Sequence, residues 1–462
     1  MTIEVKSPYD NSIVGSVTRK TESEAEAVLA KAYTLSKDKS KALQKHERVA
    51  ILEKLVVLTS EKADEFAMLI AQEGGKPLMD AKVEVARAID GIKIAIKEMM
   101  HVFHGEEIPM GFSKSSENKL AFTTREPIGV VLAISAFNHP LNLIVHQVVP
   151  AIAVGCPVIV KPAGTTPLTC QKFIELVHKA GLPVDWCTFF PCAVPVAEIL
   201  VSDKRISFFS FIGSSGVGWH LRNKLNPGTR YALEHGGVAP AIVDKSVDDL
   251  DAIVASIVKG AYYHAGQVCI STKRVYIHKD MMPEMSKKIA EAVKKLKVGD
   301  PTKIETEVGP LISEKELERV ESWVNEAIAE GATLLAGGKR ISSSVFEATL
   351  LLEPSKKSKV SVDETFGPVL CLYAYENIDD AIAWANSLDL PFQSAIYSNN
   401  MNVITKAYNE LEASAITVNE NTAFRVDWMP FAGRRSAGHG IGGIGHTMME
   451  MTQYKMMVIK TK

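Results

Sequence analysis

Short hydrophobic runs, separated by segments of helix length, dominate the middle of the chain. Within these runs apolar residues follow one another without strict alternation, which is typical of strands that are buried on both faces. Their regular interruption by helix-length segments predicts a parallel, doubly wound α/β sheet. A second α/β region is predicted from about residue 245 to 430. The runs of the first region are 128–137, 157–161, 187–191, 206–213 and 239–244.

The first hundred residues have a helical pattern after a short extended start. Thr21 and Glu24 match a capping box ahead of the alanine-rich run AEAVLAKAY, since each side chain can accept from the other residue's backbone N–H. Two further helical stretches are predicted around 46–73 and 77–100, with Gly-Gly-Lys-Pro between them. The charged stretch 314–330 is predicted to be an amphipathic surface helix.

Composition narrows the class of protein. The chain has 462 residues, of which 46% are hydrophobic and 23% charged, and its 52 basic and 54 acidic residues give a formal net charge of −2. At roughly 150 residues per domain, this length predicts two to four structural units. Balanced charge without basic runs argues against a nucleic-acid or polyanion partner. The hydrophobic content excludes intrinsic disorder, which leaves multi-domain enzymes as the main class.

Targeting and metal signals are not found. The N-terminal residues MTIEVK lack the basic and apolar regions of a signal peptide, and the apolar runs are far shorter than the roughly 20 residues of a membrane helix. We therefore expect a cytoplasmic protein without a membrane partner. No HExxH or carboxylate cluster accompanies His101 and His104, so no metal site is predicted. The six cysteines form no CxxC pair and are too sparse for a disulfide scaffold; they stand at 156, 170, 187, 192, 269 and 371.

Three residue patterns suggest chemistry at the ends of predicted strands. Cys269 follows a Gly-Gln turn that could lift its thiol out of the core, where backbone N–H groups could lower its pKa; the alternative is a buried, inert cysteine. Glu234, beside a glycine pair, suits a partly desolvated general base or an ordinary surface carboxylate. Asn138 could donate to a developing oxyanion or serve as a turn residue.

A glycine-rich turn follows one of the apolar runs. Residues 213–218, GSSGVG, lie between a predicted strand and a predicted helix, where backbone N–H groups and the helix N-terminus can approach an anion. The turn is neither a GxGxxG fingerprint nor a phosphate-binding loop ending in Gly-Lys-Ser/Thr. A plain tight turn is therefore an equally good interpretation.

Taken together and in order, these motifs identify a family. The sequence resembles the aldehyde dehydrogenase superfamily over almost the whole chain, and chance agreement of eleven ordered motifs is negligible. The motifs are REPIGVV (125–131), FNHPLN (137–142), VIVKP (158–162), AGLP (180–183), FIGSSGVG (211–218), LEHGG (233–237), GQVC (266–269), GPLI (309–312), ETFGPV (364–369), VN (418–419) and PFAGRRSAG (430–438).

The resemblance implies an NAD(P)-dependent, non-acylating enzyme with assigned catalytic roles. Cys269 would add to the aldehyde as a thiohemiacetal, Asn138 and the Cys269 backbone N–H would form the oxyanion hole, and hydride transfer would leave a thioester. Glu234 would activate the water that hydrolyses it. Implied cofactor-binding residues are Lys161, Gly213, Ser214, Gly218, Glu364 and Phe366.

The resemblance also implies the fold and its division. A Rossmann-like cofactor domain would comprise residues 1–108 and 128–236, and an α/β catalytic domain residues 237–444. A small β extension, residues 109–127 and 445–462, would mediate assembly into a homodimer or homotetramer.

The end of the chain fits such an extension. Residues 453–460 have the pattern of an edge strand, and the polar stretch 119–127 is the predicted partner, either within the chain or across subunits.

Departures from the family pattern concern the cofactor and the turn before the nucleophile. The family usually has a glutamate three residues after Lys161, where this chain has Gly164. Without that carboxylate a 2′-phosphate is not repelled, so NADP is a candidate beside NAD. His264 stands where the family usually has asparagine, and His235 where it usually has leucine.

The positions that line the aldehyde tunnel in the family indicate the substrate. An arginine in a mostly closed pocket is costly unless it meets an anion, so Arg425 predicts a small polar aldehyde with a carboxylate, sulfonate, phosphonate or phosphate. Alternatively, Arg425 pairs with Asp427 or another buried acid. The stretch RVDWMP (425–430) also resembles relatives acting on lactaldehyde-like or phosphorylated short aldehydes. The implied substrate residues are His139, Leu143, His146, Tyr263, Val268, Ile270, Arg425 and Phe431.

Two rival functions differ in testable features. A CoA-acylating relative would resolve the thioester with CoA instead of water, and that branch usually lacks the hydrolytic glutamate that Glu234 supplies here. A catalytically silent, crystallin-like structural protein would have no need of Cys269, Asn138 and Glu234 together.

Overall fold

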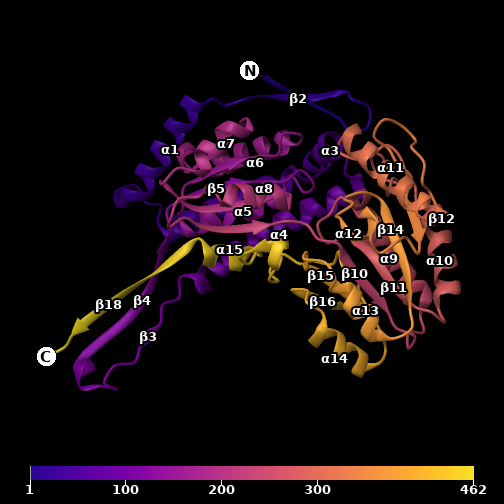
Figure 1. Ribbon diagram of the computed structural model, residues 1–462. Helices are drawn as coiled ribbons and strands as arrows, with labels where there is room; N and C mark the ends of the chain where they lie inside the picture. Colours follow the sequence, from indigo (N-terminus) through magenta and orange to yellow (C-terminus); the bar gives the residue numbers. More distant parts are fainter. Residues whose placement is uncertain (1) are drawn as a thin grey trace.

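Two large sheets, each mostly parallel, form the frame of the protein (Figure 1). The structure is a computed structural model and describes residues 2–462. The first sheet has six strands in the order β17-β9-β8-β5-β6-β7, with β17 antiparallel at one edge. The predicted doubly wound sheet is confirmed, with strands a few residues shorter than the apolar runs, except that the run 239–244 forms a strand of the second sheet, β10 (Ala239–Val243). Its strands are β5 (Val130–Ile134), β6 (Val158–Lys161), β7 (Cys187–Phe189), β8 (Ile206–Ile212), β9 (Arg230–Glu234) and β17 (Gly438–His439).

Helices cover both faces of the first sheet, which explains why its strands are apolar at successive positions. Val131 and Ala133 of β5 pack in one core, while Val130, Leu132 and Ile134 pack in the core on the opposite face. The first core is closed by α2 (Lys45–Glu61), α3 (Ala63–Gly74), α4 (Leu78–Val102), α5 (Asn142–Val154), α6 (Pro167–Ala180) and α15 (Ile444–Glu450). The second is closed by α1 (Glu22–Lys37), α7 (Val194–Val201) and α8 (Ser215–Arg222).

The N-terminal helices follow the prediction with one difference. The capping box at Thr21 and Glu24 is present, and both of its hydrogen bonds are made. The predicted stretch 46–73, however, is two helices, because Lys62 leaves helical geometry (φ −107°, ψ 12°) between α2 and α3. No helix-breaking residue marks this point in the sequence; the change of direction instead lets both helices bury apolar faces in the same core.

The second sheet has seven strands in the order β12-β13-β14-β11-β10-β15-β16, with β12 antiparallel. One face is covered by α9 (Leu250–Tyr262) and α10 (Met282–Lys295), the other by α11 (Glu314–Ala329), α12 (Lys359–Val362), α13 (Ile378–Ala385) and α14 (Met401–Glu410). The strands are β10 (Ala239–Val243), β11 (Thr272–His278), β12 (Thr333–Ala336), β13 (Thr349–Leu352), β14 (Val369–Tyr375), β15 (Gln393–Tyr397) and β16 (Ala415–Val418).

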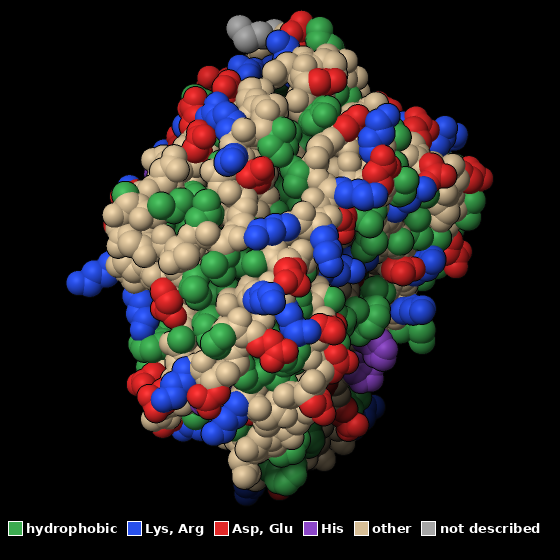
Figure 2. Space-filling view, turned by 90° about the vertical axis from the view of Figure 1, so that its right-hand side faces the viewer, with side chains coloured by type: hydrophobic (Ala, Val, Ile, Leu, Met, Phe, Trp, Pro, Cys, Tyr) green, Lys and Arg blue, Asp and Glu red, His purple; other side chains and the backbone are tan. Residues whose placement is uncertain are grey.

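The predicted amphipathic helix at 314–330 is confirmed as α11. It buries one residue every three or four positions, Leu317, Val320, Val324 and Ala327, which is the spacing of a single apolar stripe. The side of the molecule that carries α11 intersperses Lys and Arg with Asp and Glu (Figure 2). This mixture agrees with the balanced net charge.

A long antiparallel ribbon projects from the body of the protein (Figure 1). It consists of β3 (Glu107–Ile108), β4 (Lys119–Pro127) and β18 (Thr452–Lys460). Strand β18 pairs with β4 over its whole length, from Thr452 opposite Pro127 to Lys460 opposite Lys119. The predicted partner of the closing strand is therefore confirmed, and the pairing lies within the chain.

A small hairpin, β1 (Thr2–Lys6) with β2 (Ile13–Thr18), precedes α1. Over residues 2–462, none of the helices combines the length and the apolar character needed to cross a bilayer.

Two fully buried glutamates hold helix N-termini beneath the first sheet. Glu73 accepts from the backbone N–H groups of Leu168 and Thr169 at the start of α6, each at 2.9 Å. Glu84 accepts from Leu141 and Asn142 at the start of α5, at 2.9 and 3.1 Å. Both carboxylates lie at the positive end of a helix dipole.

Glu84 has a second partner, the buried ammonium of Lys76. Lys76 is 1% exposed at its side chain and Glu84 is 0% exposed. Removing one member of such a pair leaves the other as an uncompensated charge in the interior.

Glu84→Gln should therefore lower the free energy of unfolding by about 3–5 kcal/mol, because the Lys76 ammonium would then face an amide. Urea unfolding followed by tryptophan fluorescence measures the difference. Asp64→Asn is the control, since its carboxylate is 90% exposed and pairs with Lys82 at the surface, and it should leave the unfolding midpoint unchanged. Equal midpoints for Glu84→Gln and the parent would contradict this account.

Candidate active site

A cavity of about 1080 Å³ is lined by residues that stand at the ends of strands from both sheets. Asn138, Gly213 and Glu234 reach it from the carboxyl ends of β5, β8 and β9, whereas Cys269 and Glu364 reach it from the segments before β11 and β14. All five line the cavity. Residues that the sequence separates by up to 226 positions are thus brought to one place by the meeting of two sheet edges.

The turn before Cys269 has an unusual backbone. His264, Ala265 and Gly266 all have left-handed φ angles, at 48°, 53° and 67°. Such a run is unfavourable for residues with a side chain, so contacts outside the turn must hold it. One of them is the Asp80 carboxylate, which accepts from the His264 backbone N–H at 3.2 Å.

Gln267 anchors the other end of this turn. Its side-chain amide donates to the Pro310 carbonyl at 3.1 Å and accepts from the Ile312 N–H at 2.9 Å. Gln267 is 1% exposed, so these bonds are shielded from water. They explain why the motifs around 266–269 and 309–312 occur together: one segment fixes the backbone of the other.

Cys269 lines the cavity and is partly exposed, while the other five cysteines are buried. Burial raises the pKa of its thiol to about 12, with Arg425 the main group acting in the opposite direction. The backbone N–H group acts in the direction that the sequence suggested, but desolvation outweighs it and the net shift of this pKa is upward. The resting group is therefore a thiol.

Glu234 is the last residue of β9, and its backbone is fixed by pairing with Gly438 of β17. Burial raises the pKa of its carboxyl group, and Arg425 opposes that effect. The carboxylate lies against Gly442, where any side chain would overlap it. A desolvated carboxylate in a cavity is suited to taking a proton at neutral pH.

Asn138 is 5% exposed and fixed to the same turn as Cys269. Its side-chain nitrogen donates to the Gln267 carbonyl at 2.9 Å. An amide nitrogen carries two hydrogens, so one is left for an oxygen in the cavity.

The predicted cofactor residues divide into two groups. Gly213, Ser214, Glu364 and Phe366 line the cavity, whereas Lys161 and Gly218 lie outside its lining. The Lys161 ammonium lies at the end of β6, donates to the Pro162 carbonyl at 3.3 Å, and has its pKa lowered by burial. At Gly218 any side chain would overlap the ring of His235, so packing alone requires this glycine.

Glu364 provides the observation that tests whether a dinucleotide fits. Its Oε1 atom is buried and has no hydrogen-bond partner among residues 2–462. Burial raises the pKa of this carboxyl group to about 7, and Lys273 opposes the shift most strongly. An unpartnered acceptor beside the cavity matches the hydroxyl donors of a ribose. The residues present therefore fit NAD or NADP.

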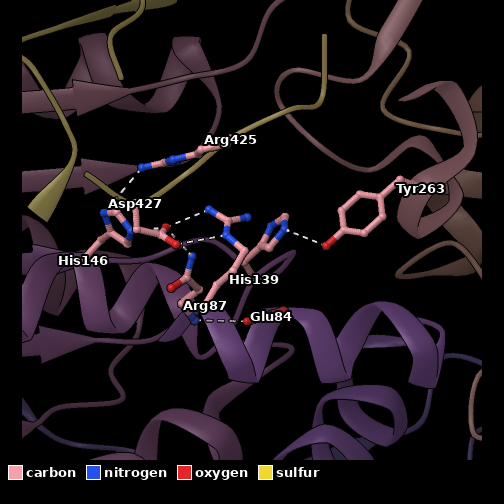
Figure 3. A network of polar contacts seen from close by, with 8 residues as sticks. Glu84, Arg87, His139, His146, Tyr263, Arg425 and Asp427 are labelled. Carbon is pink, nitrogen blue, oxygen red and sulfur yellow. Dashed lines mark hydrogen bonds and ion pairs between the residues drawn. The ribbon is translucent and has the colours of Figure 1, made fainter. Parts of the chain in front are cut away.

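Of the eight predicted substrate residues, Val268 and six others line the cavity, while His146 does not. The Tyr263 hydroxyl lies 3.4 Å from His139 Nε2 (Figure 3). Burial lowers the pKa of His139 well below its usual value, and the nearby cations Lys76, Arg87 and Arg425 act in the same direction. The six are His139, Leu143, Tyr263, Ile270, Arg425 and Phe431.

Behind this wall, the Asp427 carboxylate gathers three donors (Figure 3). Arg87 binds it with two bonds, of 3.1 and 2.7 Å, while Asn142 donates at 3.1 Å and His146 Nε2 lies at 2.7 Å. Burial alone would raise the pKa of Asp427, but the bonds from His146 and Arg87 outweigh it and keep this pKa below its usual range.

Arg425 is connected to this group only through His146. Because His146 Nε2 faces Asp427, its Nδ1 is left to accept from the Arg425 guanidinium, which lies 3.4 Å away. Burial lowers the pKa of His146 to about 4, so the ring is neutral at pH 7. No carboxylate within residues 2–462 forms an ion pair with Arg425, although Glu234 and Asp427 act on it electrostatically; its guanidinium stacks on Phe431 at 3.5 Å from the ring centre.

Sequence reasoning missed Arg87 and Glu84, which lie on the inward side of α4. The usable signal was the spacing: both fall on or beside the stripe of small apolar residues that faces the core, Ala81, Val85, Ala88 and Ile92. Charged residues there must have buried partners. No group of three His, Cys, Asp or Glu side chains in the described chain, residues 2–462, is arranged to hold a metal ion.

Comparison with known proteins identifies the family that the chain matches and two similar proteins. Residues 1–457 match the Aldehyde dehydrogenase family. The chain is 34% identical to a 3-sulfolactaldehyde dehydrogenase from Priestia aryabhattai, over 99% of this chain and 94% of that protein. It is 35% identical to a lactaldehyde dehydrogenase from Methanococcus vannielii, over 99% and 97%.

A solved structure agrees along the whole chain. The glyceraldehyde-3-phosphate dehydrogenase GapN from Methanocaldococcus jannaschii, complexed with NADP, superimposes with a TM-score of 0.94 at 33% identity. The match covers 99% of this chain and 99% of that one.

The raised thiol pKa predicts how Cys269 reacts with iodoacetamide. Because the thiolate is the reactive form and its pKa is about 12, the alkylation rate should rise about tenfold per pH unit from pH 7 to 10. Mass spectrometry of the peptide containing Cys269 measures it. Arg425→Met should slow the reaction at every pH, since Arg425 favours the thiolate; a plateau below pH 9 would show that the thiol is not desolvated.

Proposed function

The chain belongs to the aldehyde dehydrogenase family, and on that basis we propose that it oxidises a short, anionic aldehyde to the carboxylate without acyl transfer to CoA. It is an NAD(P)-dependent oxidoreductase, and one similar solved structure is complexed with NADP. The observation that carries the substrate class is the Arg425 guanidinium, which lines the cavity beside Cys269 and has no carboxylate partner within residues 2–462.

The charge of Arg425 is available because of the arrangement around Asp427. Arg87, which also lines the cavity, is neutralised by a bidentate bond to that carboxylate. The hydrogen-bond partner of Arg425 is instead a neutral imidazole nitrogen of His146. An unpaired guanidinium in a desolvated pocket favours a ligand with a carboxylate, sulfonate or phosphate group.

The names of the relatives agree with such a substrate. One is a 3-sulfolactaldehyde dehydrogenase and another a glyceraldehyde-3-phosphate dehydrogenase, and both names denote short aldehydes with an anionic group. A lactaldehyde dehydrogenase, also similar, is named for a short polar aldehyde. These names support the class of substrate and do not single out one compound.

We assign the chemistry to three side chains. Cys269, after losing its thiol proton, attacks the aldehyde carbon as the thiolate. The oxygen that becomes negative is held by the free N–H of Asn138 and the Cys269 backbone N–H. A bound NAD(P) would supply the hydride acceptor, and loss of hydride from that carbon would leave a thioester on Cys269. Glu234 takes a proton from the water that hydrolyses the thioester and so frees the thiol.

Both nicotinamide cofactors fit the proposed site. A side chain placed at Gly164 would meet nothing within 4 Å, so the position near Lys161 leaves room for a 2′-phosphate. Absence of a carboxylate at this position removes the repulsion that would exclude NADP. Glu364 and Phe366 are proposed to hold the nicotinamide ribose and ring, and Gly213 and Ser214 the pyrophosphate.

The ribbon is the proposed site of assembly into a homodimer or homotetramer. Its outer strand β18 exposes a run of apolar side chains, Met456, Met457, Val458 and Ile459. Exposed apolar strands of this length are normally covered by another chain. All six cysteines are free thiols, which agrees with the proposed cytoplasmic location.

Substitution of Arg425 tests the substrate class. Arg425→Ala should lower kcat/KM for 4-oxobutanoate roughly 10- to 150-fold, the value of one charged hydrogen bond, and leave butanal within about threefold. Steady-state NAD(P)H formation, measured with each cofactor, gives both numbers. Arg340→Ala, which removes a surface cation that pairs with Glu314 and Glu321 of α11, should change neither. Equal losses for the two aldehydes would refute the proposal.

Substitution of Glu234 tests how the thioester is resolved. Glu234→Gln should give one equivalent of NAD(P)H per site in a rapid burst and then turn over about 10²–10⁴ times more slowly, because water is no longer activated. Stopped-flow absorbance shows the burst, and product analysis with and without CoA identifies what is released. Acyl-CoA as the product of the parent enzyme would favour the acylating alternative.

A further inference from the structure

Lys273 is a buried cation four residues after Cys269. It is 1% exposed and lies in β11. Its ammonium donates to two backbone carbonyls, those of Gly266 at 2.6 Å and Gly367 at 3.0 Å. The carboxylate that acts on it most strongly is Glu364. Two backbone carbonyls from two segments therefore contact one ammonium, and the Glu364 carboxylate of the second segment acts on it electrostatically.

The two carbonyls belong to the two segments that meet the reacting centre. Gly266 ends the left-handed turn that precedes Cys269. Gly367 directly follows Phe366, itself left-handed at φ 43°, in the segment that is proposed to hold the nicotinamide ribose. A side chain at Gly266 would overlap the Gly367 carbonyl, so the two backbones are in contact.

This contact is unfavourable without a positive charge. Two carbonyl oxygens that approach the same point, with the Glu364 carboxylate nearby, repel one another in a desolvated interior. Burial lowers the pKa of Lys273 to about 7, although the Glu364 carboxylate acts in the opposite direction. The ammonium converts mutual repulsion into two hydrogen bonds.

We propose that Lys273 is a positioning residue that acts as a tethered cation, setting the spacing between the thiol of Cys269 and the 364–366 segment. The proposal rests on the function proposed above, in which hydride passes from the carbon on Cys269 to a nicotinamide held by Glu364 and Phe366. Misplacement by about 1 Å can cost 10²-fold in rate, so hydride transfer should depend on this lysine. Thioester hydrolysis depends on Glu234, which comes from the first sheet, and should not.

Lys273→Ala and Lys273→Met separate the cation from the bulk of the side chain. Alanine leaves space lined by two carbonyls and a carboxylate, the donors that a small cation prefers, whereas methionine fills the space with an apolar chain. In both variants single-turnover hydride transfer should fall about 10²-fold, with an increased isotope effect for aldehyde deuterated at the carbonyl carbon. Ammonium or methylammonium chloride should restore much of the rate in Lys273→Ala only.

The same measurement of single-turnover hydride transfer, with and without ammonium, serves for the control variant and for the outcomes that would contradict the proposal. Lys279→Met removes an exposed lysine that pairs with Glu376 at the end of β11, and it should behave as the parent does, with or without ammonium. Unchanged hydride transfer, loss confined to thioester hydrolysis, absence of rescue in Lys273→Ala, or equal rescue in Lys273→Met would each overturn the proposal. If the alanine and methionine variants do not fold, Lys273→Gln, a neutral donor, should show the same increased isotope effect.

Failure of the tethered-cation proposal is distinguishable from failure of the proposed function. If Cys269→Ser still oxidised aldehydes through the same rapid burst, the assignment of Cys269 itself would be wrong. If the parent enzyme shows the burst and the Lys273 variants match it, only the role of Lys273 fails.

Discussion

Removal of ionisable groups from water, at the place where the two sheet edges meet, governs the chemistry of this protein. Burial raises the pKa of Cys269, Glu234 and Glu364, and it lowers that of Lys273 and His146. Desolvation favours the neutral form of every group, so each charge that remains needs a specific partner. Most charged groups around the cavity are consequently paired with a partner of opposite charge or with a hydrogen-bonding group. The reactivity of the cavity depends on which groups lack such a partner.

The substrate end shows how pairing assigns roles to similar residues. Arg87 and Arg425 both line the cavity, but a single carboxylate, Asp427, lies behind them. Arg87 takes that carboxylate in a bidentate bond, while His146 links it to Arg425 through a neutral ring. One arginine is thereby neutralised by a carboxylate, and the other lines the cavity without an ion-pair partner within residues 2–462. His146, which the family pattern placed in the tunnel wall, lies outside the cavity lining and accepts a hydrogen bond from Arg425.

Much of the fold could be predicted because its rules are local. The apolar runs of the first sheet are buried on both faces, as Val130 and Val131 show by packing in opposite cores. Capping at Thr21 and the stripe of α11 depend only on spacing along one helix. The break at Lys62 could not be predicted, because it is caused by the packing of two helices in a shared core. Whether β18 pairs within the chain or across subunits was likewise open, because either partner satisfies the same strand pattern.

The amino-acid sequence by itself determined the family, the two-sheet fold and the identity of Cys269, Glu234 and Asn138 as the residues to examine, because ordered motifs preserve residue types at turns that end strands. It could not determine electrostatic surroundings. The pKa of Cys269, the partner of Arg425 and the two carbonyls on Lys273 depend on atoms far apart in the chain that only the meeting of two sheets brings within a few ångströms. Coulomb and desolvation energies depend on those distances and on burial, and neither is encoded in sequence spacing.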